Sequence, residues 1–249
     1  MNLDLEVMPN DLYKLTKENK DELAERILKE YSPRNLNLAE ALDIDWFLEE
    51  CLFLNPRTER LSLDNSILGM IAFDNTEVDC YDYRLKPKKI VLEEREVVTE
   101  MCLGGRNDVR RLRYTKAHEC SHWILHRRYF SPEKRDYAFR KNKQYIACRS
   151  IENAGYKHKM STEELIEWQA NSLGASLLMP KDIFKEVART EIRSHGIRRD
   201  CILQSDNKQE VFDIITNVSD IFVVSKEATR IRFRELGLIM TEDEYYNFI

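Results

Sequence analysis

Residues 117–126 read AHECSHWILH and contain three of the five histidines of this 249-residue chain. Around them, small or apolar side chains recur at steps of three and four residues, at Tyr114, Ala117, Ser121 and Ile124. This spacing predicts a helix over about residues 107–128 with one buried face, and Asn107 or Asp108 is the expected N-cap. The histidines are therefore expected on a helix rather than in a loop.

The first two histidines of this stretch have the spacing of metal ligands. His118 and His122 are four residues apart, so on a helix their imidazoles lie one above the other and can bind a single ion. Glu119 projects about 100° around the helix from His118, where its carboxylate can reach a water molecule bound to that ion. In zinc peptidases such a water has a pKa of about 7, and the carboxylate accepts its proton. We expect His118 and His122 as Zn²⁺ ligands and Glu119 as the catalytic base.

A third ligand is expected on a second helix. Residues 162–178 follow a capping-box pattern, Ser161 with Glu164, and end at Met179-Pro180. Glu167 is the expected third zinc ligand, and the alternative is a solvated acidic face that suits the start of a helix.

Two further residues are expected beside the ion rather than on it. Asn171 lies one turn after Glu167 and is placed to orient a ligating imidazole through its free N–H. His126 lies about 12 Å of helix rise from His118, too far for both to bind one ion. It is expected to contact the site or to pack beside it. Small residues at Ala170 and Gly174 would allow the two helices to approach closely.

The rest of the chain predicts an α+β protein. Further helices are expected at residues 19–31, 44–53, 182–193, 209–219 and 226–236, the last with Ser225 as N-cap and Gly237 after its end. Strands are expected at residues 67–73 and 89–94, with 61–63 as a further candidate. We expect N-terminal helices over 1–55, a zinc peptidase core over 56–180 and a C-terminal helical region over 181–249.

Composition narrows the classes of function. A net charge of −5 does not indicate a dedicated nucleic-acid binder, and seven glycines and six prolines exclude collagen-like and turn-dense folds. The six cysteines include no CxxC pair and are expected as reduced thiols. No leader and no apolar run of membrane-spanning length is visible, which predicts a cytoplasmic protein with no membrane partner.

Two segments resemble a known family. HECSHWILH and the later EWQANSLGASLLMP (167–180) are similar to the ImmA/IrrE family of zinc metallo-endopeptidases, which has His-Glu-Leu-Gly-His, then Glu-x-x-Ala-Asn/Asp and Leu-Leu-Met-Pro. The similarity extends to LGMIAFDN (68–75), KIVLEE (89–94) and IFVVSKEATRIRFRELGL (221–238), and covers most of residues 40–240.

The resemblance implies a gluzincin-like peptidase in a helix-rich, zincin-like domain with a small sheet. It implies His118, His122 and Glu167 as ligands and Glu119 as the base. Cys120-Ser121 stands where the family has Leu-Gly. A role for Cys120 as a fourth ligand is the less favoured alternative, because its side chain points about 100° further round the helix than Glu119.

Residues 129–160 form an insertion that the family does not explain. From Arg127 to Lys159, ten basic residues stand against three acidic ones. A substrate-binding flap, a contact to nucleic acid and a solvated basic loop are all open, and the solvated loop is favoured. Tyr145 and Tyr156 are candidates for stabilising an oxyanion.

Residues 209–236 resemble a helix-turn-helix unit. Basic side chains of its second helix could face DNA, namely Lys226, Arg230, Arg232 and Arg234. Plain packing of a helix pair is the favoured alternative, so nucleic acid is a less favoured partner.

These observations predict a zinc-dependent metallo-endopeptidase that cleaves a protein. The resemblance implies a helix-turn-helix transcriptional repressor as substrate, in stress or mobile-element regulation. The alternative is a DNA-binding or regulatory protein with a structural or vestigial metal. Glu119 favours the enzyme, because a structural site needs no base. KIVLEE at 89–94 precedes the motif helix and is expected as the sheet edge to which an extended substrate adds, with a central strand as the alternative.

Overall fold

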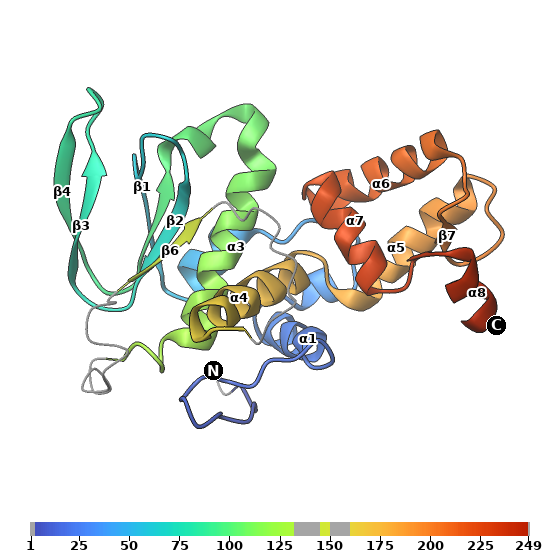
Figure 1. Ribbon diagram of the computed structural model, residues 1–249, viewed down its shortest axis with the longest axis horizontal. Coiled ribbons are helices and arrows are strands. Elements are labelled where there is room, and N and C mark those ends of the chain that lie inside the picture. The colour runs from blue at the N-terminus through green and yellow to red at the C-terminus, as the bar shows by residue number, and fades with distance from the viewer. Residues whose placement is uncertain (1–2, 132–144, 150–159, 249) are drawn as a thin grey trace. The chain divides into compact units, whose positions relative to one another are not determined.

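The computed structural model describes residues 3–131, 145–149 and 160–248, and the statements below concern these residues (Figure 1). The expected α+β class is confirmed. The chain forms two compact units, one of Met1–Leu23 with Asp43–Gly174 and one of Ala24–Leu42 with Ala175–Ile249. The region 1–55, expected as N-terminal helices, is thus shared between the units, whereas 181–249 lies within the second.

A four-stranded sheet organises the first unit. Its order is β1–β5–β2–β6, in which β1 and β5 are parallel and the other neighbours antiparallel. The strands are β1 (Asn55–Glu59), β2 (Ile67–Ala72), β5 (Glu96–Glu100) and β6 (Tyr145–Arg149). Helix α3 (Val109–His126) packs on one face. A hairpin of β3 (Thr76–Tyr81) and β4 (Pro87–Leu92) covers the other (Figure 1).

Alternation along β2 separates the two faces of the sheet. Met70 and Ala72 join an apolar cluster with Val98 of β5 and with Val78 and Leu92 of the hairpin. Successive side chains of a strand point to opposite faces, so Gly69 faces α3. The apolar cluster therefore determines which face of the sheet packs against α3.

The expectation that residues 89–94 form the edge of the sheet at the site is wrong. These residues lie largely in β4, which pairs with β3 in a separate two-stranded sheet. The strand that precedes α3 in the main sheet is β5, between β1 and β2. Both faces of β5 are covered, so Val97, Val98, Thr99 and Glu100 are all buried. Among the described strands, β6 is the edge next to β2.

Residues 61–63 are not a strand, and a buried carboxylate explains why. Glu100, 1% exposed, accepts hydrogen bonds from the backbone N–H groups of Leu61 at 2.6 Å and Ser62 at 3.2 Å. It also accepts one from Cys102 at 3.4 Å. Backbone donors that a ladder would use are therefore bound by a side chain.

The predicted helices are present with small shifts at their ends. Ser161 and Glu164 cap α4 reciprocally, since the Ser161 N–H donates to Glu164 Oε2 at 2.7 Å and the Glu164 N–H to Ser161 Oγ at 3.2 Å. Besides α3, the helical elements up to and including this capped helix are α1 (Lys20–Tyr31), η1 (Pro33–Leu36), α2 (Ile44–Trp46), the π-helical η2 (Phe47–Cys51), η3 (Met101–Gly104), η4 (Arg106–Asp108) and α4 (Thr162–Leu178).

The second unit is mainly helical. Its core brings the ring of Phe184 to 5.3 Å from Phe222 and 5.5 Å from Phe233. Ser225 caps its helix as predicted, because its side chain accepts from the Ala228 N–H at 3.1 Å. Its elements after α4 are α5 (Lys181–Ser194), β7 (Ile202–Leu203), α6 (Lys208–Phe222), α7 (Lys226–Glu235), β8 (Ile239–Met240) and α8 (Glu242–Phe248).

Arg232 does not face solvent, so the less favoured possibility that it faces DNA is wrong for this residue. The side chain is 1% exposed, and its Nε and Nη2 atoms donate to the Met179 carbonyl at 3.2 and 3.0 Å. Its Nη1 donates to Glu235 at 3.2 Å. Arg232 therefore joins α7 to the end of α4 within this unit.

No helix among residues 3–131 and 160–248 combines the length and apolar character needed to cross a membrane.

Candidate metal centre

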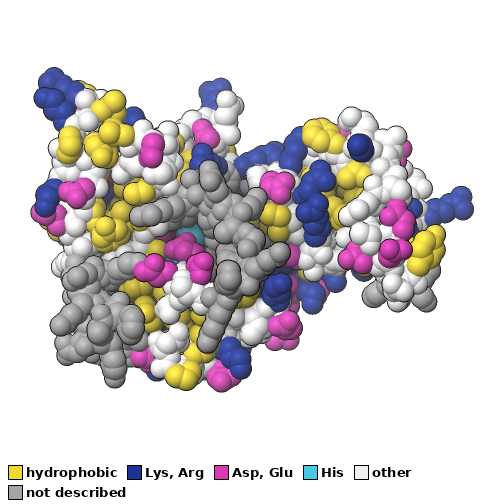
Figure 2. Space-filling model, viewed as in Figure 1, with side chains coloured by type: hydrophobic (Ala, Val, Ile, Leu, Met, Phe, Trp, Pro, Cys, Tyr) yellow, Lys and Arg dark blue, Asp and Glu magenta, His cyan; other side chains and the backbone are white. Residues whose placement is uncertain are grey.

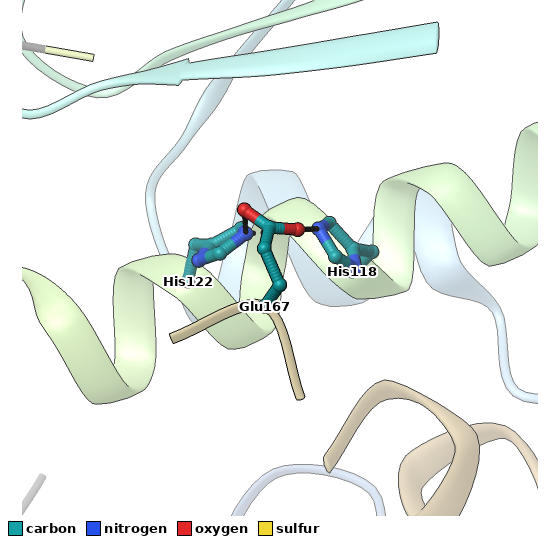
Figure 3. Close-up of side chains that lie close together, drawn as sticks. All are labelled: His118, His122 and Glu167. Atoms are coloured by element: carbon teal, nitrogen blue, oxygen red, sulfur yellow. Dashed lines mark hydrogen bonds and ion pairs between the residues drawn. The ribbon is translucent and has the colours of Figure 1, made fainter. Parts of the chain in front are cut away.

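The three predicted ligands converge at one point of the first unit (Figure 3). His118 and His122 stand one turn apart on α3 and are fully buried, and their Nε2 atoms are 2.8 Å apart. Glu167 approaches from α4, with Oε2 3.4 Å from His118 Nε2 and Oε1 3.6 Å from His122 Nε2. Its side chain is 31% exposed, and Figure 2 shows acidic side chains with a small part of a histidine visible behind them.

The donor set fits a zinc ion. Zinc binds nitrogen and carboxylate oxygen at about 2.0–2.2 Å, so donors in a tetrahedral site are roughly 3.3 Å apart. The separations of 2.8, 3.4 and 3.6 Å bracket this value. Two imidazoles and one carboxylate supply three ligands, which is the number found where a fourth position is open to water or substrate.

Asn171 orients the first imidazole, as predicted. Its Oδ1 atom lies 3.0 Å from His118 Nδ1 and also accepts a hydrogen bond from the Tyr114 hydroxyl at 3.2 Å. An acceptor at this position places the proton on Nδ1 and leaves the Nε2 lone pair facing Glu167. Tyr114 was expected only on the buried face of the helix, and its contact with Asn171 was not predicted.

His126 contacts the site without reaching the ligand cluster. Its Nδ1 atom is 3.0 Å from His122 Nδ1, and its Nε2 atom is 2.9 Å from Gln169 Oε1. Burial lowers the pKa of His126 to about 4 and holds that of His122 well below its usual value. Both rings are therefore neutral at neutral pH. Gln169 was not predicted, although it stands on α4 two residues after Glu167.

Glu119 is a buried carboxyl group at the same place. Neither of its oxygens has a hydrogen-bond partner among the described residues, and its side chain is fully buried. Burial raises the pKa of Glu119 to about 8, with the charge of His118 lowering it and that of Glu167 raising it further. An unpartnered carboxyl beside two imidazoles and a second carboxylate suits a group that exchanges a proton next to a cation.

Two glycines bring the surrounding elements close to the site. A Cβ on Gly69 would lie 2.6 Å from Glu119 Oε1 and 2.6 Å from Thr115 Cγ2, so only glycine allows β2 to approach α3 here. A Cβ on Gly174 would lie 3.3 Å from the Ala117 backbone. The close approach of the two helices at Gly174 is thus confirmed. Gly69 was missed, although a glycine inside an apolar strand is itself a signal of close approach.

Of the remaining candidates, Cys120 and Tyr145 are described by the structure and do not join the site. Cys120 is fully buried and lies outside the group of donors, and burial raises the pKa of its thiol. Tyr145 packs against the apolar cluster on the hairpin side of the sheet, away from α3. Tyr156 and most of the insertion 129–160 lie outside the described residues. The described cysteine side chains form no disulfide, as expected.

Comparison of the chain with protein-family models, with curated protein sequences and with solved structures found no match.

Proposed function

We propose that this protein is a zinc-dependent metallo-endopeptidase with a zincin-like core. One observation carries the proposal: His118, His122 and Glu167 present three metal donors within 4.8 Å of one another, and the carboxyl group of Glu119 lies buried beside them with no hydrogen-bond partner among the described residues. This combination supplies both a cation site and a group that can accept a proton.

Each residue has a defined part in peptide hydrolysis. A bound zinc ion polarises a carbonyl group and lowers the pKa of a water molecule that it binds. Glu119 accepts the proton of the attacking water and returns it to the departing amine, and general acid–base catalysis of this kind contributes about 10²–10⁴-fold. Asn171 and His126 hold the two imidazoles in the orientation that directs Nε2 at the cation.

The composition of the site favours catalysis over a structural metal. Structural zinc is held by four protein ligands, commonly including cysteine. Among the residues that the structure describes, three supply donors, and the one cysteine of the motif, Cys120, lies outside their group. A structural site also gains nothing from Glu119, whose buried carboxyl destabilises the fold when ionised.

The substrate is a protein in this proposal. The resemblance of residues 118–126 and 167–180 to ImmA/IrrE peptidases suggests a helix-turn-helix repressor and a cytoplasmic site of action. The alternative of a DNA-binding protein with a vestigial metal is weakened by Arg232, which is buried and bound to a backbone carbonyl.

Two variants test the proposal. Purified wild-type protein should contain about one zinc per chain, and His118→Ala should contain much less. Glu119→Gln should keep its zinc and fold but lose cleavage of an unfolded protein substrate, and of a repressor encoded beside the gene. Unchanged zinc in His118→Ala, or wild-type cleavage by Glu119→Gln, would contradict the proposal.

A further inference from the structure

The N-terminal residues of the chain form a fixed loop in the first unit. Val7 and Tyr13 make an antiparallel bridge, and the Met8 N–H donates to the Leu12 carbonyl at 2.8 Å. Leu12 and Leu15 are buried, at 0 and 4% exposure. Buried side chains on both sides of Tyr13 therefore hold its carbonyl in place.

That carbonyl is the start of a continuous hydrogen-bond chain. Gln169 Nε2 donates to the Tyr13 carbonyl at 2.6 Å, and Gln169 Oε1 lies 2.9 Å from His126 Nε2. His126 Nδ1 lies 3.0 Å from His122 Nδ1. We call this series of hydrogen bonds, which runs from Tyr13 through Gln169 and His126 to His122, the N-terminal chain. Gln169, His126 and His122 are each 0% exposed, so water cannot substitute for a missing member.

The chain has only one consistent direction. A backbone carbonyl can only accept, so the amide nitrogen of Gln169 faces Tyr13 and its oxygen faces His126. That oxygen requires a proton on His126 Nε2, which leaves His126 Nδ1 as an acceptor. His126 Nδ1 in turn requires a proton on His122 Nδ1. The lone pair of His122 Nε2 then faces Glu167 Oε1 at 3.6 Å and His118 Nε2 at 2.8 Å.

We infer that the N-terminal loop is part of the metal centre, with Gln169 and His126 as positioning residues that fix the tautomer of His122. The inference rests on the proposed zinc site. It gives residues far from the motif in sequence a role in zinc affinity, since partners of this kind change metal affinity by about 10–100-fold.

The two imidazoles of the metal centre are oriented by different partners, so the inference predicts an effect on only one of them. His118 is oriented by Asn171 and Tyr114, and Tyr114 stands on α3 itself. The N-terminal chain reaches only His122. Loss of Gln169 should therefore disturb one ligand and leave the other in place.

A double-mutant cycle on the full-length protein tests the coupling. Gln169→Leu and His126→Phe should each lower zinc affinity by about 10–100-fold, measured by competition with a chelator. Because both break the same chain, the double variant should bind no more than a few-fold more weakly than the worse single variant. The visible absorption spectrum of Co²⁺-loaded protein should change in the same way in all three variants.

Ser121→Ala is the matched control, because Ser121 is also buried on α3 but donates to the Ala117 carbonyl at 2.7 Å. It should leave the affinity and the Co²⁺ spectrum unchanged. Single-variant losses that multiply in the double variant, or a Gln169→Leu protein with wild-type affinity, would overturn the inference while leaving the zinc site intact. Wild-type protein that binds no zinc would overturn the proposed function and, with it, this inference.

A measurement on the metal-free wild-type protein avoids any question of folding. The imidazole nitrogen chemical shifts should identify the Nδ1–H tautomer for His122 and the Nε2–H tautomer for His126. The opposite tautomer on His126 would refute the chain directly, whatever the variants do.

Discussion

Gly69 on β2 lies directly against Glu119 on α3, and an added Cβ atom would be 2.6 Å from the carboxylate oxygen Oε1. Gly69→Ala must therefore displace the Glu119 side chain, and a misplacement near 1 Å can cost about 100-fold in rate. We expect a loss of peptidase turnover of that order with zinc content unchanged, measured by steady-state kinetics and elemental analysis.

Gly104→Ala is the control for this change, because a Cβ at Gly104 would meet nothing within 4 Å. It should retain wild-type turnover. Equal loss in both variants would point to a general cost of replacing glycine rather than to displacement of the base.

Glu167→Gln should weaken zinc binding without abolishing it. The amide is a poorer ligand than the carboxylate, but His118 and His122 remain 2.8 Å apart at Nε2 and still offer two donors. His122→Ala should cause the larger loss, since only one imidazole is left. Chelator competition should give the order wild type, Glu167→Gln, His122→Ala, and a reversed order would argue against Glu167 as the weaker of the donors.

Glu119 should make the metal-free protein less stable as the pH rises. Its pKa is about 8 in the folded chain and 4.5 when unperturbed, so the unfolded chain loses this proton first. The stabilising contribution is full below about pH 4.5 and is lost by about pH 8, at roughly 1.4 kcal/mol per pH unit.

Glu119→Gln removes this titration. With a chelator present, the variant's free energy of unfolding should exceed that of the wild type by a margin that grows from pH 5 to pH 8 and then levels. Denaturant titrations at several pH values measure the margin. A difference that does not depend on pH would contradict the assigned pKa of Glu119.

Glu100→Gln should destabilise the sheet without touching the metal. The carboxylate accepts three backbone N–H groups, from Leu61, Ser62 and Cys102, and an amide offers only one oxygen to them. Leaving a buried donor unpaired costs about 1–3 kcal/mol, which a denaturation midpoint would show. The exposed Glu94 provides a control, since Glu94→Gln should be neutral.

The helices and the candidate ligand set were predictable because their signals are local. The spacing of His118 and His122 and the capping box of α4 depend only on residues within a few positions of each other. Glu167 and Asn171 followed because one turn of a helix places them side by side. Their convergence on His118 was predicted chiefly through the resemblance of two segments to a family.

The sheet was harder because its pairing is not local. β5 was missed because both of its faces are covered, so its sequence does not alternate between apolar and polar residues. β4 was assigned to the wrong sheet because the sequence of a strand does not indicate which other strand it pairs with. Gln169 and the Tyr13 carbonyl lie 156 positions apart. Because every residue has a backbone carbonyl, the sequence does not indicate which one accepts this hydrogen bond. Arg232 resembles its exposed neighbours by type, and only packing distinguishes it.

The hydrogen bonds at Nδ1 of His118 and His122 decide how many protons leave when the centre is loaded. In a neutral ring whose proton is held on Nδ1, the nitrogen that faces Glu167 carries none, so a neutral imidazole has no proton to release. Glu119, with a pKa of about 8, is protonated at pH 7 and must ionise beside the arriving cation. Zinc uptake at pH 7 should therefore release about one proton. The calorimetric heat should vary with the ionisation enthalpy of the buffer for the wild type, but not for Glu119→Gln. In the proposed mechanism, metal loading thus converts Glu119 from an acid into the base that peptide hydrolysis requires.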